Sequence, residues 1–129
     1  NLSGSVKVKF MGLVSHAELS NILPQADIFV MFSRSEGMPR AIIEAMAVGL
    51  PIITTNVGFC ADLVRNGVEG FVLEDDSEAE FFDCLSYLLT NQEIRAHMGS
   101  SARERAISEY DSEKLYTRYR SLICETALE

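Results

Sequence analysis

Cysteine is scarce in this sequence and has none of the spacings typical of metal sites. Cys60, Cys84 and Cys124 are odd in number and far apart, with no C-x-x-C or Cys/His pair. These features argue against a disulfide framework and against zinc, so we expect reduced thiols and no metal. A run of apolar residues long enough to span a bilayer is also lacking. Reduced thiols, with no signal-peptide pattern in the printed residues, lead us to expect a cytoplasmic location.

Positive charge is scarce as well. The 129 residues include 11 Lys and Arg against 19 Asp and Glu, which gives a formal net charge of −8. Sequence-independent nucleic-acid binding needs basic side chains that neutralise phosphates, and docking on anionic lipid needs them too. We therefore expect no nucleic-acid partner. Hydrophobic residues make up 47% of the chain, which is typical of a globular domain with its own core.

Four short runs rich in Val, Ile and Phe predict strands. The two central runs are mostly apolar rather than alternating, as in strands that are covered on both faces. Helical patterns lie between the runs, so we expect right-handed crossovers and an α/β, doubly wound parallel sheet. The four predicted strands are Val6–Phe10, Ile28–Phe32, Pro51–Thr55 and Gly70–Leu73.

Helix starts are marked by local signals. Ser15–Glu18 and Ser77–Glu80 both have the S-x-x-E spacing of a capping box before apolar residues at helix periodicity. A helix from about Pro39 to Val48 is predicted to end at the following glycine. After Leu73 the chain is predicted to be helical to its end. Further helices are predicted from about Cys60 to Arg65, Gln92 to Glu109 and Ser112 to Ala127.

The start of the Pro39 helix has the features of an anion site. Pro39 suits the first helical position, which makes Met38 the N-cap, and Met38 offers no side-chain oxygen to the free N–H groups. Gly37 allows a ligand to approach the backbone closely. Because the preceding strand ends near Ser33, this helix start lies at the carboxyl edge of the sheet, where open α/β sheets bind ligands. A phosphate group would satisfy the free donors.

Glu44 follows in an otherwise apolar run, about 7–8 Å further along the helix. Its neighbours predict a helix that is buried nearly all round, and a buried carboxylate needs donors. Vicinal ribose hydroxyls would supply them. Two simpler readings stay open at this point: Arg40 pairs with Glu44 four residues away on the same face, and Glu36 is a loop carboxylate in water.

These residues resemble the donor-binding signature of the retaining GT-B glycosyltransferases, the "glycosyl transferases group 1" family. SRSEGMPRAIIEAMAVGLPIITTNVG contains the family's E-x7-E pattern, from Glu36 to Glu44, and its E-A-M-A-x-G-x-P run. AELSNILPQADIFVMFS, VRNGVEGFVL and the Glu109–Asp111 segment are similar to flanking parts of the family. The resemblance covers nearly the whole chain and implies a single, partial Rossmann-like domain over residues 1–129, with about four parallel strands.

The resemblance also implies roles for particular residues. Glu44 would bind the ribose hydroxyls of a sugar nucleotide, and Glu36, the implied catalytic residue, would contact the donor sugar. The backbone of Gly37 and Met38, with the helix start at Pro39, would hold sugar hydroxyls and the diphosphate. The loop of Met11, Gly12 and Leu13 would lie near the base. The implied donor is a UDP-, GDP- or ADP-linked sugar, the acceptor is an unknown hydroxyl, and no metal cofactor is implied.

Several departures from the family limit what the chain is expected to do alone. The Arg and Lys that neutralise the leaving diphosphate precede anything in this sequence, and so does the acceptor-binding N-terminal domain. We therefore expect the chain alone to be inactive, with any membrane association of the parent enzyme depending on that domain. In the usual strand order 3-2-1-4-5-6, strands 1 and 2 are missing, so the first predicted strand would be left without a neighbour. Phe59 stands where the family often has a second glycine, and Asp62 where it often has glutamate.

The reading to which these features lead is the donor-binding part of a retaining glycosyltransferase. A sugar-nucleotide epimerase of the same architecture is one alternative, although the E-A-M-A-x-G-x-P context does not favour it. A non-catalytic module that keeps only the nucleotide pocket is another, and the missing basic pair favours it.

Overall fold

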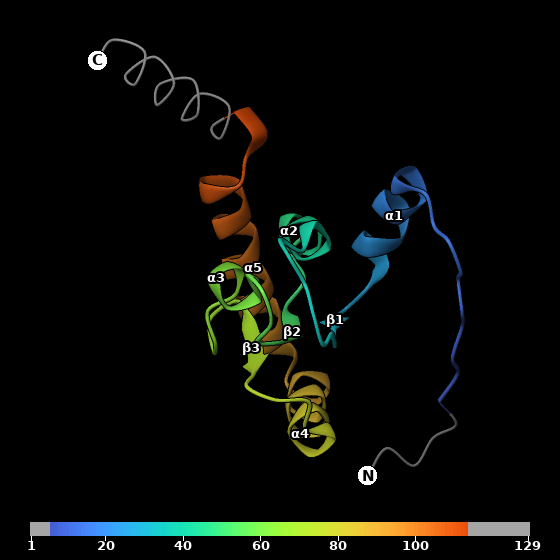
Figure 1. The fold of residues 1–129 in the computed structure, drawn as a ribbon, viewed down its shortest axis with the longest axis vertical. Coiled ribbons are helices and arrows are strands. Elements are labelled where there is room, and N and C mark those ends of the chain that lie inside the picture. The colour runs from blue at the N-terminus through green and yellow to red at the C-terminus, as the bar shows by residue number, and fades with distance from the viewer. Residues whose placement is uncertain (1–5, 114–129) are drawn as a thin grey trace.

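A three-stranded parallel sheet with helices on both faces forms the part of the chain that the computed structural model describes, residues 6–113 (Figure 1). The elements in chain order are α1 (His16–Ile22), the short 3-10 helix η1 (Leu23–Gln25), β1 (Phe29–Met31), α2 (Arg40–Ala47), β2 (Ile52–Thr55), α3 (Cys60–Leu63), β3 (Gly70–Leu73), α4 (Glu78–Thr90) and α5 (Gln92–Glu109).

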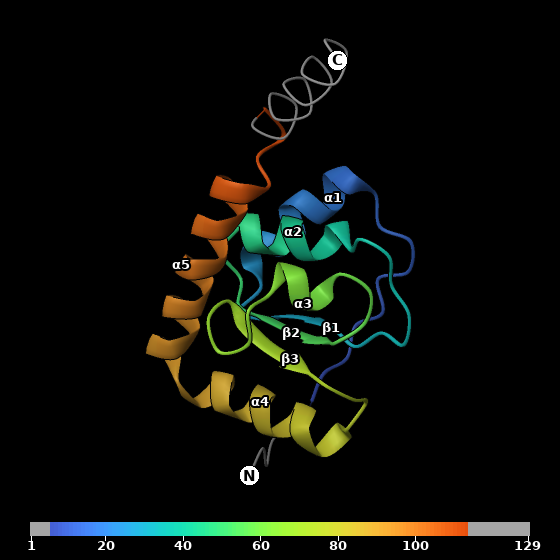
Figure 2. The same cartoon turned by 60° about the vertical axis from the view of Figure 1, so that its left-hand side comes forward.

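The strands lie in the order β1, β2, β3, and both neighbouring pairs are parallel. Ile52 and Val72 belong to one apolar cluster, whereas Ile53 and Leu73 belong to a second. Successive residues of a strand point to opposite faces, so these clusters show a sheet buried on both sides. Figure 2 shows α1, α2 and α3 on one side of the sheet, α4 on the other and α5 along its flank. The predicted α/β fold with a parallel sheet is confirmed, with three strands instead of about four.

The predicted first strand, Val6–Phe10, is not a strand in the structure. Val6, Val8 and Phe10 are 78%, 70% and 93% exposed, and Figure 1 shows this segment apart from the sheet. A strand needs a neighbour for its backbone hydrogen bonds, and the expected strand order places two strands between this run and β1. None of the described residues forms those strands. The prediction of a strand here is wrong, because an apolar pattern does not make a strand without a partner.

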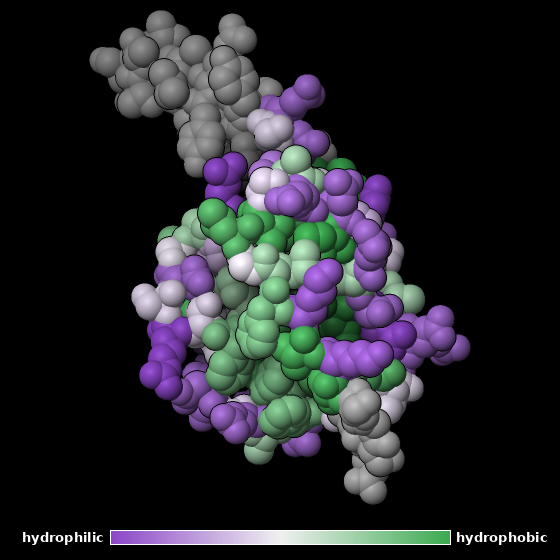
Figure 3. Space-filling view, turned by 90° about the vertical axis from the view of Figure 1, so that its right-hand side faces the viewer, coloured by the Kyte–Doolittle hydropathy of each residue, from purple (hydrophilic) through white to green (hydrophobic). Residues whose placement is uncertain are grey.

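The outer edge of β1 is open, since no strand within residues 6–113 pairs with it. Val30 and Phe32 at this edge are 38% and 43% exposed. Figure 3 shows the molecule from the side on which β1 lies, and apolar side chains cover much of this face. Native proteins usually cover or charge such an edge. An open apolar edge beside β1 is the arrangement expected when strands 1 and 2 of the sheet are not among the described residues.

Helix α2 begins one residue later than predicted. Pro39 is the N-cap (φ −78°, ψ 94°), and Arg40 is the first helical residue. The fixed φ of proline suits either position, and the extended ψ decides between them. No side chain in the described chain caps this end, so the helix start is uncapped as predicted. The helix buries Ile42 and Met46 on one face, whereas Glu44 is only partly buried, so the prediction of a helix buried nearly all round is wrong.

The other helix starts follow their local signals. Ser15 and Glu18 form a reciprocal capping box at α1, with the Ser15 N–H donating to Glu18 Oε2 at 2.8 Å and the Glu18 N–H donating to Ser15 Oγ at 3.2 Å. At α4 the Ser77 side chain accepts from the Glu80 N–H at 3.3 Å. Both predicted starts are confirmed.

Two helix ends differ in how well the sequence predicts them. Helix α5 has the predicted bounds, Gln92–Glu109. Helix α3 ends at Leu63 rather than near Arg65, because Val64 takes an extended conformation. Most of the helix predicted from Ser112 to Ala127 lies outside the described residues. Within residues 6–113, no helix combines the length and the hydropathy that crossing a membrane requires.

Candidate functional site

The two predicted glutamates lie near the edge of the sheet at which the strands end. Glu36 is in the loop between β1 and α2, and Glu44 is in the second turn of α2. Because the strands are parallel, the loops that follow β1, β2 and β3 meet at the same edge. Ligands of open α/β sheets bind at this edge, which we therefore take as the candidate site.

Glu36 is half-buried and is held by a neighbouring hydroxyl. Ser33 Oγ donates a hydrogen bond to Glu36 Oε1 at 2.8 Å. Ser33 is in turn bound to β2, because Thr55 Oγ1 donates to the Ser33 carbonyl at 2.5 Å and accepts from the Ser33 N–H at 3.1 Å. The second carboxylate oxygen of Glu36 forms no hydrogen bond with the residues that the structure describes. This oxygen is available to a hydroxyl of a ligand.

The backbone at Glu36 and Gly37 packs directly against the loop after β2. The Phe59 N–H donates to the Gly37 carbonyl at 3.2 Å. Gly58 has a φ of +53°, and a Cβ placed on it would overlap the Glu36 carbonyl oxygen and lie 2.6 Å from the Gly37 carbonyl oxygen. Only glycine fits here. The Phe59 side chain is 55% exposed.

The start of α2 is the part of the site that an anion would approach. Met38 is 52% exposed, and the following residue, Pro39, is buried. The first N–H groups of a helix lack intrahelical partners, and no side chain of the described residues caps them here. The helix dipole adds partial positive charge at this end. These features make the α2 start chemically suited to a phosphate.

Glu44 lies further along α2 with its side chain 32% exposed. Its neighbour is His16 at the start of α1, with Nδ1 3.6 Å from Glu44 Oε1. Within the described chain, Arg40 forms no ion pair with Glu44, so the simpler reading of a local Arg40–Glu44 pair is not what the structure shows. The imidazole is itself 79% exposed. Glu44 therefore keeps both solvent access and spare acceptor capacity.

The structure does not join Met11, Gly12 and Leu13 to the two glutamates. Met11 and Leu13 are exposed, and Gly12 has a φ of +65° with open space beside it. Among the described residues, the three make no hydrogen bond or ion pair with Glu36 or Glu44. They lead into α1, whose His16 does meet Glu44.

A cavity of about 210 Å³ lies at the carboxyl ends of all three strands. Arg34 Nη2 lies 3.8 Å from Asp76 Oδ2 at this cavity. Asn56 Nδ2 donates to Glu74 Oε2 at 3.1 Å across the same cavity. The cavity is lined by Ser33, Arg34, Thr55, Asn56, Val57, Glu74, Asp75 and Asp76.

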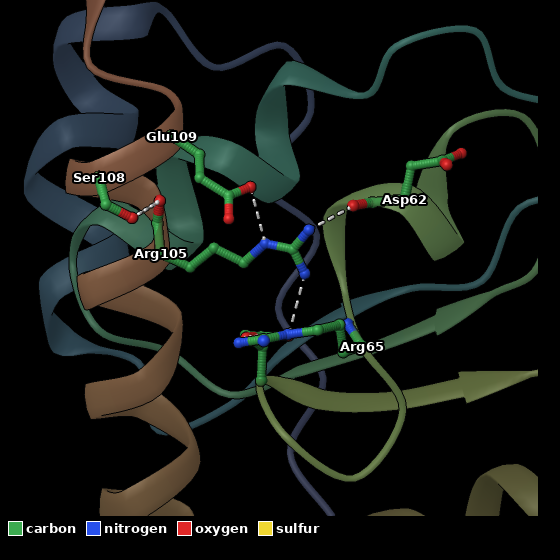
Figure 4. Close-up of polar contacts among 6 residues, drawn as sticks. Asp62, Arg65, Arg105, Ser108 and Glu109 are labelled. Atoms are coloured by element: carbon green, nitrogen blue, oxygen red, sulfur yellow. Dashed lines mark hydrogen bonds and ion pairs between the residues drawn. The ribbon is translucent and has the colours of Figure 1, made fainter. Parts of the chain in front are cut away.

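The most deeply buried carboxylate of the described chain was not singled out by the sequence. Glu69 is fully buried just before β3. It accepts hydrogen bonds from the Arg65 N–H at 2.8 Å and from the Arg65 guanidinium, and Arg105 Nη1 lies 3.4 Å from its Oε2. Arg105 also donates to the Asp62 carbonyl at 2.8 Å and to Glu109 at 3.2 Å. Figure 4 shows Arg105 reaching from α5 toward Asp62 and Glu109.

These contacts make Glu69 a structural residue. Burial by itself would raise the pKa of the Glu69 carboxyl, but hydrogen bonds and charge from Arg65, with charge from Arg105, bring that pKa below its ordinary value. The carboxylate is therefore ionised and paired. One signal of the contact was present in the sequence, since Arg65 and Glu69 are four residues apart. The Arg105 contact joins residues that are 36 positions apart, which no local pattern reveals.

Comparisons with known proteins place the chain in context. The family model described as "Glycosyl transferases group 1" matches residues 1–105. The chain is 29% identical to N-acetyl-alpha-D-glucosaminyl L-malate synthase of Bacillus anthracis over 95% of its own length and 32% of that protein. It is 30% identical to UDP-Gal:alpha-D-GlcNAc-diphosphoundecaprenol alpha-1,3-galactosyltransferase of Escherichia coli, over 92% and 30% of the two chains. The chain thus spans about a third of the length of these relatives.

A solved structure has the same fold. Anabaena Alr3699/HepE, crystallised in complex with UDP and glucose, superposes with a TM-score of 0.83 and 22% identity over 91% of this chain and 32% of that one.

Proposed function

Because the chain belongs to the glycosyl transferases group 1 family, we propose that it is the donor-binding part of a retaining glycosyltransferase. The observation that carries this proposal is that one helix, α2, combines an uncapped start with a partly exposed glutamate, Glu44. Glu36 lies in the loop just before that start. The diphosphate of a sugar nucleotide would lie at the α2 start, where the N–H groups and the helix dipole favour an anion. The two carboxylates would accept hydrogen bonds from hydroxyl groups on either side of the diphosphate.

Each residue has a role in this proposal. Glu44 accepts hydrogen bonds from the two ribose hydroxyls, for which its solvent-accessible carboxylate has room. Glu36 accepts a hydrogen bond from a hydroxyl of the donor sugar through the carboxylate oxygen that is not bonded to Ser33. The backbone of Gly37, Met38 and Pro39 lines the path between them. The chemistry asked of the site is electrostatic stabilisation of the leaving diphosphate and positioning of the sugar, with no metal ion.

A UDP-linked sugar is the donor that we propose. The name of the E. coli relative specifies UDP-Gal, and the Anabaena structure holds UDP and glucose. The base would lie toward Met11, Gly12 and Leu13, which lead into the helix that carries His16. The acceptor hydroxyl and the basic residues that meet the leaving diphosphate would come from an N-terminal part of the enzyme, so the chain alone would bind donor without transferring it.

The test is a thermal-shift titration of this chain with UDP, GDP, ADP and their sugar conjugates, after a circular-dichroism melt has shown cooperative folding. A rise in melting temperature with UDP and UDP-sugars that Glu44→Ala abolishes supports the proposal. Glu104→Ala, which removes an exposed glutamate of α5, is the matched control and should leave the shift intact. A cooperatively folded chain that no nucleotide stabilises would refute the proposal.

A further inference from the structure

The loop that carries Glu36 follows β1, which pairs with β2 in the sheet. The loop itself is also hydrogen-bonded to β2 through a side chain. Thr55, the last residue of β2, is 3% exposed. Its hydroxyl donates to the Ser33 carbonyl and accepts from the Ser33 N–H. One hydroxyl thus provides hydrogen-bond partners for both the N–H and the C=O of Ser33, which lies 22 positions earlier in the chain. The backbone at Ser33 is fixed where β1 has already ended.

Ser33 passes this constraint on to the carboxylate. Its hydroxyl donates to Glu36 Oε1 at 2.8 Å, a hydrogen bond to a charged group, which is stronger than one between neutral groups. The carboxylate cannot rotate freely while this bond is made. Thr55, Ser33 and Glu36 therefore form a continuous series of hydrogen bonds from the buried end of β2 to the candidate site.

A second contact holds the same loop from the other side. The Phe59 N–H donates to the Gly37 carbonyl, and the absence of a side chain at Gly58 lets the loop after β2 lie directly against the Glu36 carbonyl. Gly58 also needs its positive φ of +53° to make this approach. The loop after β1 is thus fixed at both ends by residues of β2 and the loop that follows it.

We propose that Thr55, Ser33 and Gly58 are positioning residues for Glu36, which hold its carboxylate so that the oxygen not bonded to Ser33 meets the donor sugar. This inference rests on the proposed function, in which Glu36 binds that sugar. A carboxylate held in one orientation before the ligand arrives loses little conformational entropy on binding. The three residues act through Glu36, so their removal affects the sugar moiety of the donor rather than its nucleotide.

Thr55→Val and Ser33→Ala test the hydrogen-bonded series in the natural full-length protein. Ser33→Ala removes a hydrogen bond to a charged group and should weaken binding of the UDP-sugar by about tenfold. Thr55→Val removes only the bonds to the Ser33 backbone and should cause a smaller loss. Both variants should leave the affinity for UDP unchanged. Thr54→Val is the matched control, since Thr54 is equally buried on the same strand but bonds only to the Thr55 carbonyl, at 3.3 Å. Thr55→Ser keeps the hydroxyl and should retain the wild-type affinity. Equal losses for UDP and the UDP-sugar, or a Thr54→Val variant that behaves like Thr55→Val, would overturn the inference.

A double-mutant cycle separates failure of this inference from failure of the proposed function. If Ser33 and Thr55 act through Glu36, adding Ser33→Ala or Thr55→Val to Glu36→Ala causes no further loss of UDP-sugar affinity. Losses that simply add would refute the positioning role while leaving the role of Glu36 intact. A Glu36→Ala variant with wild-type affinity would instead refute the proposed function of that glutamate, and the positioning role with it.

Gly58→Ala tests the second contact, and Gly67→Ala is its control. Both glycines have positive φ, +53° and +82°, but a Cβ at Gly67 meets nothing within 4 Å. Backbone strain is therefore common to both variants, whereas displacement of the Glu36 backbone is confined to Gly58→Ala. We expect only Gly58→Ala to reduce UDP-sugar affinity relative to UDP. Equal behaviour of the two variants would show that strain alone accounts for the effect.

Discussion

The carboxylates of this molecule lie in two contrasting environments, one buried at Glu69 and one partly exposed at Glu36 and Glu44. Glu69 is fully buried, and guanidinium and N–H donors of Arg65 and Arg105 meet both of its oxygens. Glu36 and Glu44 lie near the edge at which the strands end, are partly buried, and have one side-chain partner each in the described chain. A carboxylate whose acceptors are filled by the protein stabilises the fold. A carboxylate with spare acceptors in a place that a ligand can reach is available for recognition.

The first consequence of this contrast concerns Glu69, where we expect the largest effect. Glu69→Ala leaves two arginines without their buried partner, so it should lower the free energy of unfolding by about 3–5 kcal/mol. Urea denaturation of the wild type and the variant measures this loss.

Glu109→Ala is the control for that experiment. Glu109 also pairs with Arg105, but its side chain is 51% exposed, and exposed pairs contribute about 0.2–1 kcal/mol. If the two variants lost the same stability, burial would not distinguish the carboxylates, and the structural role assigned to Glu69 would be wrong.

At Glu44 we expect the opposite pattern, a loss of nucleotide binding with little change in stability. Glu44→Gln should weaken UDP binding by about 1.5–3 kcal/mol, the contribution of hydrogen bonds to a charged group. It should change the free energy of unfolding by no more than about 0.5 kcal/mol, as is usual for partly exposed positions. Calorimetric titration with UDP and a denaturation curve give the two values. A variant that is destabilised but binds UDP normally would place Glu44 with Glu69 as a structural residue.

A third prediction concerns the pH dependence of stability. The folded state lowers the pKa of Glu69 below its ordinary value of 4.5. The stabilisation is therefore fully present above about pH 4.5 and is lost as the pH falls through the lower, folded-state pKa. Because Glu69→Gln resembles the protonated side chain, its stability should lie below that of the wild type at neutral pH and approach it in acid. Denaturation curves from pH 7 to pH 3 that stay parallel for the two proteins would contradict this assignment.

The smallest effect is expected at His16. The His16–Glu44 pair is long, at 3.6 Å, and the imidazole is 79% exposed, so the pair contributes little. His16→Ala should change UDP affinity by less than about fivefold. Titration with UDP measures it, and a loss as large as that of Glu44→Gln would show that His16 itself belongs to the nucleotide site.

The local signals in the sequence determined much of the secondary structure. The capping box at Ser15, the serine at Ser77 and the apolar runs of β1, β2 and β3 act over a few residues, so they can be recognised without knowing the rest of the fold. Val6–Phe10 carries the same apolar signal but forms no strand, because a strand depends on a neighbour that local sequence does not supply.

The same division applies to the candidate site. The spacing of Glu36 and Glu44 and the poor cap at the α2 start are properties of a short stretch, so the sequence alone places all three within a few residues of one helix start. Only the tertiary structure decided that Thr55 and Gly58 hold the Glu36 loop, and that Glu69, not Glu44, is the fully buried carboxylate. Burial and cross-strand hydrogen bonds depend on which distant segments pack together, and that packing is set by the whole chain rather than by any one pattern within it.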